Sequence, residues 1–356
     1  MDKKPLIVKW LAIGIILLFV ATCIIPVIAQ NIEKPLPTPR GSWLYVGGSG
    51  PGNYSIIQYA INDANPGDTI FVYDESSPYF ENIRIDKSLT LVGEDKTTTK
   101  IDGNGNDVVI TVTLCSHVNI HGFTIKNGDQ NLIRLDSCER CSISENILFG
   151  SDCLGIFLSK SHNNELLNNI IIFGSGILSK YCINNTIAHN NISFAMSGIV
   201  LFDSPDTKIY WNHVKYIYYN GLEIEGSSNC DIYGNIIEKN RGNGIYFYRC
   251  SNNTVRFNTI KRNTVGVGID GNQINFYSNN FINNICKVVI TEIGDYYFDS
   301  NYFNRPLHHP KCIIGLKQIM LRAPGTHGPH DPGWFITIPK LIFDANPAQE
   351  PYDIPG

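Results

Sequence analysis

The middle of the chain contains a group of seven residues, some aromatic and some acidic, whose side chains could bind a sugar. Aromatic faces can stack on sugar rings, and carboxylates accept hydrogen bonds from hydroxyl groups. These residues occupy two outward positions of a repeated unit, so neighbours in the folded chain are expected to come from successive repeats. The candidates for carbohydrate binding are Phe157, Phe202, Glu223, Glu225, Tyr246, Tyr248 and Asp270.

The same carboxylates also have spacings that glycoside hydrolysis would need. Hydrolysis uses two carboxyl groups, roughly 5–5.5 Å apart for retention and 6.5–9.5 Å for inversion. Glu223 and Glu225 share one face of a strand about 6.7 Å apart, and Asp270 lies about 9.6 Å from Glu225. Any repeat face with several acids offers such a pair, and the sequence has no Asp-Asp or Gly-His-Gly phrase. We therefore predict no catalytic residue and keep a polysaccharide lyase or glycoside hydrolase as an alternative.

A second group of side chains, near the C-terminus, has the chemistry of a metal site. Imidazole and thiolate are ligands that copper and zinc favour. Their spacing matches no closed-site pattern, so we predict no metal or other cofactor, with copper and calcium as the alternatives. The residues that a metal would use are His308, His309, Cys312, His327 and His330.

A repeat must position all of these side chains. An asparagine returns every 21 to 23 residues, with an apolar residue two positions later and another three positions earlier. A period of this length means that each unit buries its apolar face only against its neighbours, which predicts a solenoid. The asparagine column is Asn146, Asn169, Asn190, Asn212, Asn235, Asn258 and Asn279.

Composition favours strands over helices in this solenoid. The units are rich in Ile, Val, Phe, Tyr, Asn and Gly, and they lack apolar residues at helical spacing. After Gly244, for example, Ile245 and Phe247 are apolar while the positions beside them vary, which is the period of a strand. Asparagine suits the bends because it tolerates the left-handed backbone and bonds to turn groups. We predict a structural role for the asparagines and about ten coils of short strands.

Three segments resemble the pectin-lyase-like right-handed parallel β-helix repeat family: "GIYFYRCSNNTVRFNTIKRNTV" (244–265), "YSIIQYAINDANPGDTIFVY" (54–73) and "ENIRIDKSLTLVGEDKTTTKIDGNG" (81–105). The chain is most similar to the NosD-type and carbohydrate-binding or sugar-hydrolase subset of archaeal secreted proteins. The resemblance implies an all-β, right-handed, single-stranded parallel β-helix with an N-terminal capping helix. Ser55 is predicted to cap that helix. Lyases, hydrolases, adhesins and scaffolds share this fold, so the resemblance implies no single activity.

The chain divides into four parts on composition. Basic residues precede an apolar run in 1–29, which predicts a signal peptide or an N-terminal membrane anchor. The proline-containing stretch 30–42 is a linker, and 43–304 is the parallel β-helix with its N-terminal cap. Proline is concentrated in 305–356, which we predict to be a Pro-rich tail that could cap the last coil.

Charge and cysteine content narrow the possible partners and cross-links. A net charge of −4 gives no reason to expect a nucleic-acid partner. Several of the ten cysteines fit a column of small residues, where a buried free thiol behaves as a small hydrophobe. Cys115 and Cys138 occupy one phase of neighbouring coils, so a disulfide between them is allowed by geometry and stays open.

These observations favour an exported, non-catalytic scaffold or carbohydrate-binding surface protein. The expected partner is an extracellular or cell-surface glycan, and the expected location is extracytoplasmic, either secreted or anchored to the cell membrane. Contact with the membrane would run through the N-terminal segment if that segment is not cleaved. The resemblance adds one further alternative, a NosD-like accessory protein in copper-site maturation.

Overall fold

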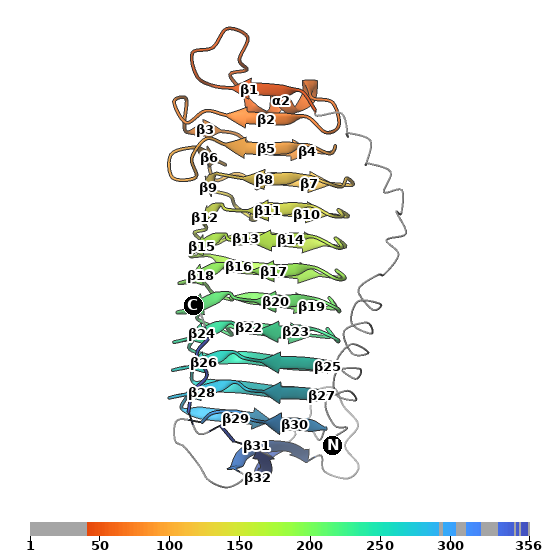
Figure 1. Cartoon of the computed structure of the whole chain (residues 1–356), viewed down its shortest axis with the longest axis vertical. Helices are drawn as coiled ribbons and strands as arrows, with labels where there is room; N and C mark the ends of the chain where they lie inside the picture. The colour runs from red at the N-terminus through yellow and green to blue at the C-terminus, as the bar shows by residue number, and fades with distance from the viewer. Residues whose placement is uncertain are drawn as a thin grey trace, which may run out of the picture. The chain divides into compact units, whose positions relative to one another are not determined.

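The computed structural model describes residues 41–291, 295–303, 311–321, 334–344, 347–348 and 350–354. The chain divides into a unit over residues 1–40 and a unit over residues 41–356, and the fold below is that of the second. This unit is an all-β parallel solenoid of about eleven turns with one short helix near its start (Figure 1). The predicted parallel β-helix with an N-terminal capping helix is confirmed.

Each complete coil contributes three short strands, and equivalent strands of successive coils pair in parallel in three columns that we call A, B and C. One coil, for example, contains β10 (Asn131–Asp136) in column A, β11 (Ser142–Ser144) in column B and β12 (Ile147–Phe149) in column C. Column C is a 10-stranded sheet. Columns A and B belong to one 22-stranded sheet, because β25 (Asn243–Arg256) and β27 (Val265–Tyr277) each run through both columns. The same sheet includes two C-terminal strands, β31 (Lys311–Leu321) and β32 (Trp334–Asp344).

The remaining strands follow the same order along the chain. Column A also holds β4 (Ile83–Ile85), β7 (Val108–Thr113), β13 (Leu154–Ser159), β16 (Ser175–Lys180), β19 (Ile199–Phe202), β22 (Leu222–Glu225) and β29 (Cys286–Ile290). Column B also holds β1 (Trp43–Val46), β2 (Thr69–Val72), β5 (Thr90–Gly93), β8 (Asn119–His121), β14 (Glu165–Leu167), β17 (Thr186–Ala188), β20 (Lys208–Tyr210), β23 (Asp231–Tyr233) and β30 (Tyr296–Asp299). Column C also holds β3 (Tyr79–Phe80), β6 (Lys100–Asp102), β9 (Thr124–Lys126), β15 (Ile170–Ile172), β18 (Asn191–Ser193), β21 (His213–Lys215), β24 (Ile236–Glu238), β26 (Thr259–Lys261) and β28 (Asn280–Ile282).

The core fills the centre of the solenoid with alternate residues of each strand. In β22, Leu222 and Ile224 are fully buried, whereas Glu223 and Glu225 beside them reach the surface. Burying one such aliphatic side chain stabilises the fold by about 1.5–3 kcal/mol. Because the coils stack in register, this alternation fixes which side chains point outward in every coil.

The asparagine column is a buried hydrogen-bonded ladder. The Asn212 Oδ1 atom accepts bonds from the backbone N–H of Asn190 at 2.9 Å and from its Nδ2 atom at 3.0 Å. The Asn212 Nδ2 atom donates to the carbonyl oxygen of Ile187 at 2.8 Å. Every polar atom of the amide thus finds a partner inside the bend, as buried polar groups require. The structural role predicted for these asparagines is confirmed.

The N-terminal helix α2 (Ile57–Asp63) covers the first coil with three buried apolar residues. The predicted cap by Ser55 is wrong, because Ile56 holds the N-cap position and makes no side-chain cap bond. Instead, the Glu81 carboxylate accepts the N–H groups of Ile57 at 2.8 Å and Gln58 at 2.9 Å. Burial raises the pKa of Glu81, although both N–H bonds act to lower it.

At the other end, β31 (Lys311–Leu321) and β32 (Trp334–Asp344) pair as an antiparallel hairpin. Strand β32 also pairs in parallel with β30, where Asp344 lies opposite Phe298. The fully buried Asp344 carboxylate accepts bonds from the Asn301 backbone N–H at 3.0 Å and from its Nδ2 atom at 2.9 Å. Asp344 therefore occupies the next rung of the asparagine ladder.

In the ranges given above, no helix has the length and apolar content to span a bilayer. The predicted signal peptide or anchor and most of the predicted linker lie in residues 1–40, outside the described residues.

Candidate functional site

The structure brings together six of the seven residues predicted for carbohydrate binding, on the outer surface of column A. Phe202, Glu225, Tyr248 and Asp270 are direct neighbours in successive coils, and Glu223 pairs with Tyr246 in the adjacent row. We call these six residues the acidic patch. Phe157 does not belong to it, because Phe157 lies in the same row as Glu223 but three coils earlier. The Arg134 guanidinium lies 5.5 Å from the centre of the Phe157 ring.

Two tyrosines form the centre of the acidic patch. The rings of Tyr246 and Tyr248 lie 6.3 Å apart and within 13° of parallel. Gly268 follows Tyr246 in the row, and a Cβ atom there would come 2.9 Å from Cδ2 of the Tyr246 ring. Glycine therefore leaves space for that ring to lie close to the sheet. Arg249 places its guanidinium 4.9 Å from the centre of the Tyr248 ring.

Carboxylates surround the two rings. None of the ion pairs among the described residues includes Glu223 or Glu225, and Glu223 accepts a bond from Asn220 Nδ2 at 3.1 Å. Burial raises the pKa of Tyr246, and the nearby Asp270 and Glu223 charges raise it further. The Tyr246 phenol therefore remains a hydrogen-bond donor at neutral pH, next to groups that only accept.

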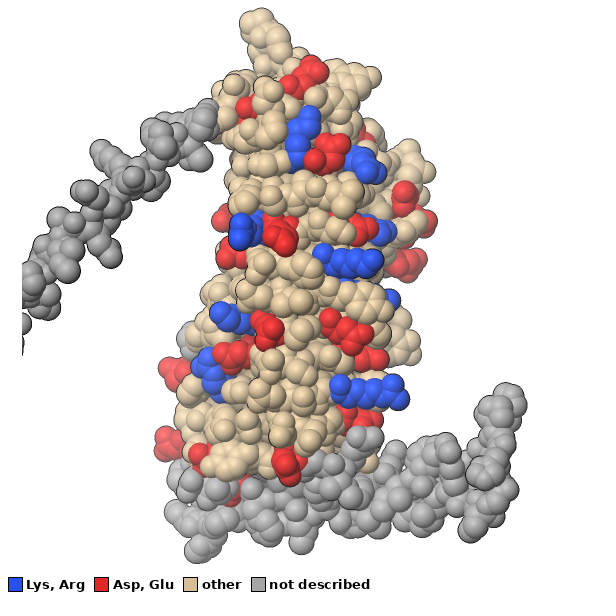
Figure 2. Space-filling model, turned by 90° about the vertical axis from the view of Figure 1, so that its right-hand side faces the viewer, with Lys and Arg blue, Asp and Glu red and all other residues tan. Residues whose placement is uncertain are grey.

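Charge is distributed in small clusters elsewhere on the surface. On the face drawn in Figure 2, basic and acidic side chains lie interspersed between broad uncharged areas. Local groups of side chains, rather than the overall charge, will therefore decide which ligand binds where.

A second candidate site is concave and lies where the C-terminal segment returns to the solenoid. This segment, residues 350–354, is called the strap. Tyr352 exchanges two backbone–side-chain hydrogen bonds with Asn280, both at 2.7 Å, and its hydroxyl donates to the Ser300 carbonyl at 2.8 Å. Its ring meets Phe257 edge to face, with centres 6.2 Å apart.

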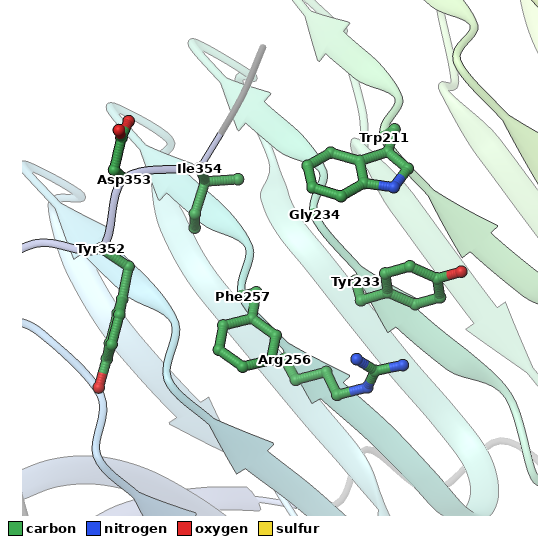
Figure 3. Close-up of a pocket in the computed structure, with 8 residues that line it drawn as sticks. All are labelled: Trp211, Tyr233, Gly234, Arg256, Phe257, Tyr352, Asp353 and Ile354. Carbon is green, nitrogen blue, oxygen red and sulfur yellow. The ribbon is translucent and has the colours of Figure 1, made fainter.

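The hollow beside the strap, here the strap pocket, has a volume of about 400 Å³. Figure 3 shows the strap on one side and the rings of Trp211 and Tyr233 on the other, with Phe257 and Arg256 between them. Pockets of about 300–1,000 Å³ with mostly apolar walls are typical of small-molecule sites. The lining residues are Trp211, Tyr233, Gly234, Arg256, Phe257, Tyr352, Asp353 and Ile354.

The cation that lines the strap pocket, Arg256, is held by a carboxylate and by an aromatic ring. Asp231 accepts two bonds from Arg256, at 3.1 Å and 2.7 Å, and the guanidinium lies 4.3 Å from the centre of the Tyr233 ring. Gly234 has a φ of +67°, and a Cβ atom there would meet the Trp211 ring at 2.8 Å. Both the left-handed backbone and the close ring explain why glycine stands at this bend.

The sequence reasoning did not identify the strap pocket. Trp211, Gly234 and Phe257 each precede a ladder asparagine, so counting back one position from the ladder would have placed them in one row. No comparable signal places Tyr352, because the strap lies outside the repeats and meets Asn280 across 72 residues.

The residues that a metal would use, His308, His309, His327 and His330, lie outside the described residues, as does the side chain of Cys312. Within the described parts of the chain, no three His, Cys, Asp or Glu side chains gather in a way that could hold a metal ion. The described cysteines, including Cys115 and Cys138, are free thiols.

Solved structures of other proteins share the fold at low sequence identity. XylC in complex with xylose matches with a TM-score of 0.58 and 11% identity, over 74% of this chain and 76% of that one. A polygalacturonase from Erwinia carotovora ssp. carotovora matches with a TM-score of 0.50 and 14% identity, over 72% of this chain and 93% of that one.

The PL6 family alginate lyase AlyGC matches with a TM-score of 0.53 and 12% identity over 70% of this chain. This chain spans 42% of the alginate lyase and 61% of the Dettilon tailspike protein, another structural match. At such identities the likeness concerns the fold alone. No curated protein matches the sequence.

One family profile matches residues 61–240 and 212–317, which together make up most of the chain. The profile describes a periplasmic copper-binding protein, NosD. The match extends over most of the solenoid described above, including the acidic patch and its repeats. The chain therefore belongs to the NosD family.

Proposed function

We propose that this protein is an exported, non-catalytic β-helix that binds a glycan outside the cytoplasmic membrane, with the acidic patch as its main binding surface. The observation that carries this proposal is the pair of nearly parallel rings of Tyr246 and Tyr248, surrounded by carboxylates on one strand face. The periplasmic location named for the family and the polysaccharide-acting proteins among the structural matches support it. The protein is released or remains held by its N-terminal segment.

The chemistry of the acidic patch favours a neutral sugar. Glu223, Glu225 and Asp270 accept hydrogen bonds from hydroxyl groups, whereas they would repel a uronate. The two tyrosine rings supply the apolar surface against which a sugar ring can lie. The strap pocket offers further aromatic rings, those of Trp211 and Tyr233, at the bend after column B.

A glycan array probed with the full-length protein tests the proposal, followed by titration of the best neutral ligand. Replacing both Tyr246 and Tyr248 by Ala should weaken binding about tenfold, since each aromatic contact contributes about 0.5–1.5 kcal/mol. Phe157→Ala is the matched control, because Phe157 occupies an outward position of the same column three coils away. No binding on the array, or equal binding by the double variant, would reject the proposal.

The lyase or hydrolase alternative makes a different prediction. Catalysis would release reducing ends from a polysaccharide, and Glu223→Gln or Glu225→Gln would abolish that release. A non-catalytic protein shows no release in the wild type, although it still binds. An assay of reducing ends on the glycans retained by the array therefore separates the two functions.

Family membership favours a second candidate function, an accessory role in copper-site maturation. The side chains that would hold copper are His308 and His309 in the tail, together with Cys312. Metal analysis of the purified full-length protein tests this role. Stoichiometric copper that disappears when both histidines are replaced by Ala would support it, and a metal-free protein after copper loading would reject it.

A further inference from the structure

A row of large side chains follows the bend after column C. Strand register places one residue of each coil at the same point of this bend, directly after β15, β18, β21, β24 and β26. Three aromatic residues are followed there by two basic ones in successive coils. This row, called the aromatic–basic stripe, consists of Phe173, Phe194, Tyr216, Lys239 and Arg262.

Every residue of the stripe has a left-handed backbone, with φ between 56° and 64°. For residues other than glycine and asparagine this conformation costs about 1–2 kcal/mol. The next coil has Asn283 at the same point, with φ 54°, so a residue that adopts this conformation more easily fits the bend. Five successive coils therefore carry a less favourable residue at this point. The same conformation recurs at other bends, for example at Glu145 and Trp211, so the side chains rather than the backbone distinguish the stripe.

The three aromatic members of the stripe form an exposed row of rings together with Phe149, the last residue of β12. Phe149 lies 5.8 Å from Phe173, Phe173 lies 6.0 Å from Phe194, and Phe194 stacks on Tyr216 at 4.9 Å. Between 41% and 54% of each of these four side chains is exposed. Contacts between neighbouring strands contribute about 0.2–1 kcal/mol each, so the row stabilises the coils while much of its apolar surface faces solvent.

A hollow of about 400 Å³ opens beside the stripe, and we call it the basic hollow. Phe194, Met196 and Tyr218 supply its apolar wall. Two cations border the hollow: Lys239 on the stripe, and Arg241, whose guanidinium lies over the Tyr218 ring. The lining residues are Phe194, Ala195, Met196, Tyr216, Ile217, Tyr218, Lys239 and Arg241.

Aromatic rings contact both cations, and Lys239 also pairs with the Glu238 carboxylate at 3.9 Å. Lys239 Nζ donates to the Tyr216 hydroxyl at 2.9 Å and lies 4.9 Å from the centre of that ring. The Arg241 guanidinium lies 5.3 Å from the centre of the Tyr218 ring. Across the described parts of the chain, no ion pair includes Arg241.

Glu238, the carboxylate that pairs with Lys239, also has two closer partners. Glu238 bonds to His213 at 2.9 Å and lies 3.6 Å from Lys261, whereas its distance to Lys239 is 3.9 Å. The hydrogen bond to Tyr216 raises the pKa of Lys239, so this side chain stays charged. The basic hollow therefore presents positive charge together with apolar rings.

We propose that the basic hollow is a second binding site, and that its ligand is an acidic saccharide. A carboxylate or sulfate group of the ligand would pair with Lys239 and Arg241, because guanidinium and ammonium groups bond strongly to such anions. The sugar ring would lie against the apolar wall of Phe194, Met196 and Tyr218. This inference rests on the proposed glycan-binding function and assigns the charged class of glycan to one site.

The shape of the site favours a saccharide over an anionic membrane. Membrane-surface segments insert a continuous apolar face below the lipid headgroups. Here the cations border a hollow of the size of a small-ligand site, and the rings beside them form a single row. A ligand that combines one ring with one anionic group fits this arrangement.

The test compares a tetragalacturonate with its fully methyl-esterified form, which keeps the rings and loses the charge. We expect the full-length protein to bind the acid about tenfold more tightly than the ester, as measured by calorimetry. Lys239→Gln with Arg241→Gln should reduce acid binding about tenfold and leave ester binding unchanged. Lys208→Gln, which removes an exposed lysine of column B, is the matched control, and circular dichroism verifies that each variant folds.

Equal affinity for acid and ester, or for the wild type and the double variant, would overturn the inference. Loss of acid binding in the Tyr246→Ala and Tyr248→Ala variant alone would assign the ligand to the acidic patch, so that the inference fails while the proposed function stands. Absence of galacturonate binding, with binding to phosphatidylglycerol vesicles that depends on Lys239 and Arg241, would assign the surface to membranes and also overturn it.

Discussion

The acidic patch and the basic hollow use the same kind of aromatic wall with opposite charge. In the patch, tyrosines alternate with core residues along straight strands, and carboxylates flank them. In the hollow, aromatic residues at bends hold Lys239 and Arg241 against their rings. The repeat thus fixes where side chains stack, whereas the residue chosen in each coil sets the charge. One solenoid can therefore offer two surfaces that select different ligands.

Charge reversal in the basic hollow should have the largest effect. Lys239→Glu with Arg241→Glu places two anions where the acidic saccharide is expected, so its affinity should fall about a hundredfold. Binding of a neutral glycan to the acidic patch should not change. Calorimetry with both ligands measures the contrast, and a parallel loss of neutral binding would show that the two surfaces are not independent.

Filling the space beside Tyr246 should have the next largest effect, and only on the patch. In Gly268→Ala the new Cβ atom would come 2.9 Å from the Tyr246 ring and 2.7 Å from Asn243 Oδ1, so the ring must tilt. Neutral-glycan affinity should fall about fivefold through the loss of ring stacking. Titration with both ligands measures this effect. Gly150→Ala is the control glycine change, because a Cβ atom there would come no closer than 3.2 Å to its neighbours and Gly150 lies outside the acidic patch. An unchanged affinity in Gly268→Ala would mean that the ring position does not matter.

Added salt should have a smaller effect, and it should weaken ligand binding at the basic hollow but not at the acidic patch. At an ionic strength of about 1 M the screening length is about 3 Å, so the attraction between exposed charges is largely lost. Acid binding to the basic hollow should weaken several-fold between low and high salt, whereas neutral binding to the acidic patch should hold. Affinities measured over a salt series test this, and equal slopes for the two ligands would contradict the assignment of charge to one site.

The smallest effect concerns the carboxylate near the stripe. Burial acts to raise the pKa of Glu238, but the bond to His213 and the charges of Lys261 and Lys239 lower it overall, below the ordinary value of 4.5. Its stabilising contribution is therefore present above pH 4.5 and is lost as the pH falls through the lower folded-state pKa. Glu238→Gln should reduce the free energy of unfolding at pH 7 by about 1–2 kcal/mol and flatten the acid limb of the stability curve.

Urea unfolding at several pH values measures this change. Glu145→Gln serves as the control, because Glu145 takes part in none of the ion pairs of the described chain. An identical acid limb in wild type and Glu238→Gln would show that Glu238 does not carry the effect.

The repeat length predicts which residues of successive coils are neighbours wherever these residues lie within paired strands. The pairing of Glu225 with Tyr248, and of Tyr248 with Asp270, follows directly from the repeat length and alternation, and the structure confirms it. Repeat spacing alone could also have placed the residues of the basic hollow in one row. The hollow itself depends on the direction of their side chains at a left-handed bend. A pattern of apolar alternation contains no information on that direction.

Contacts outside the repeat could not be predicted in this way. Glu81 caps the first helix from 23 or 24 residues away, whereas local capping rules examine only the adjacent residues. Tyr352 reaches Asn280 from a proline-rich segment that has no periodicity. Both contacts depend on where the chain returns in space, which the repeat does not specify.

Asp344 gives the solenoid a defined end. Each ladder asparagine donates hydrogen bonds from its backbone N–H and its Nδ2 atom to the Oδ1 atom of the asparagine in the next coil, as Asn279 does to Asn301. A carboxylate in the same place accepts these bonds but has no side-chain N–H to donate. The repeating pattern of side-chain hydrogen bonds therefore ends at Asp344, and a further coil could not continue the ladder from that position.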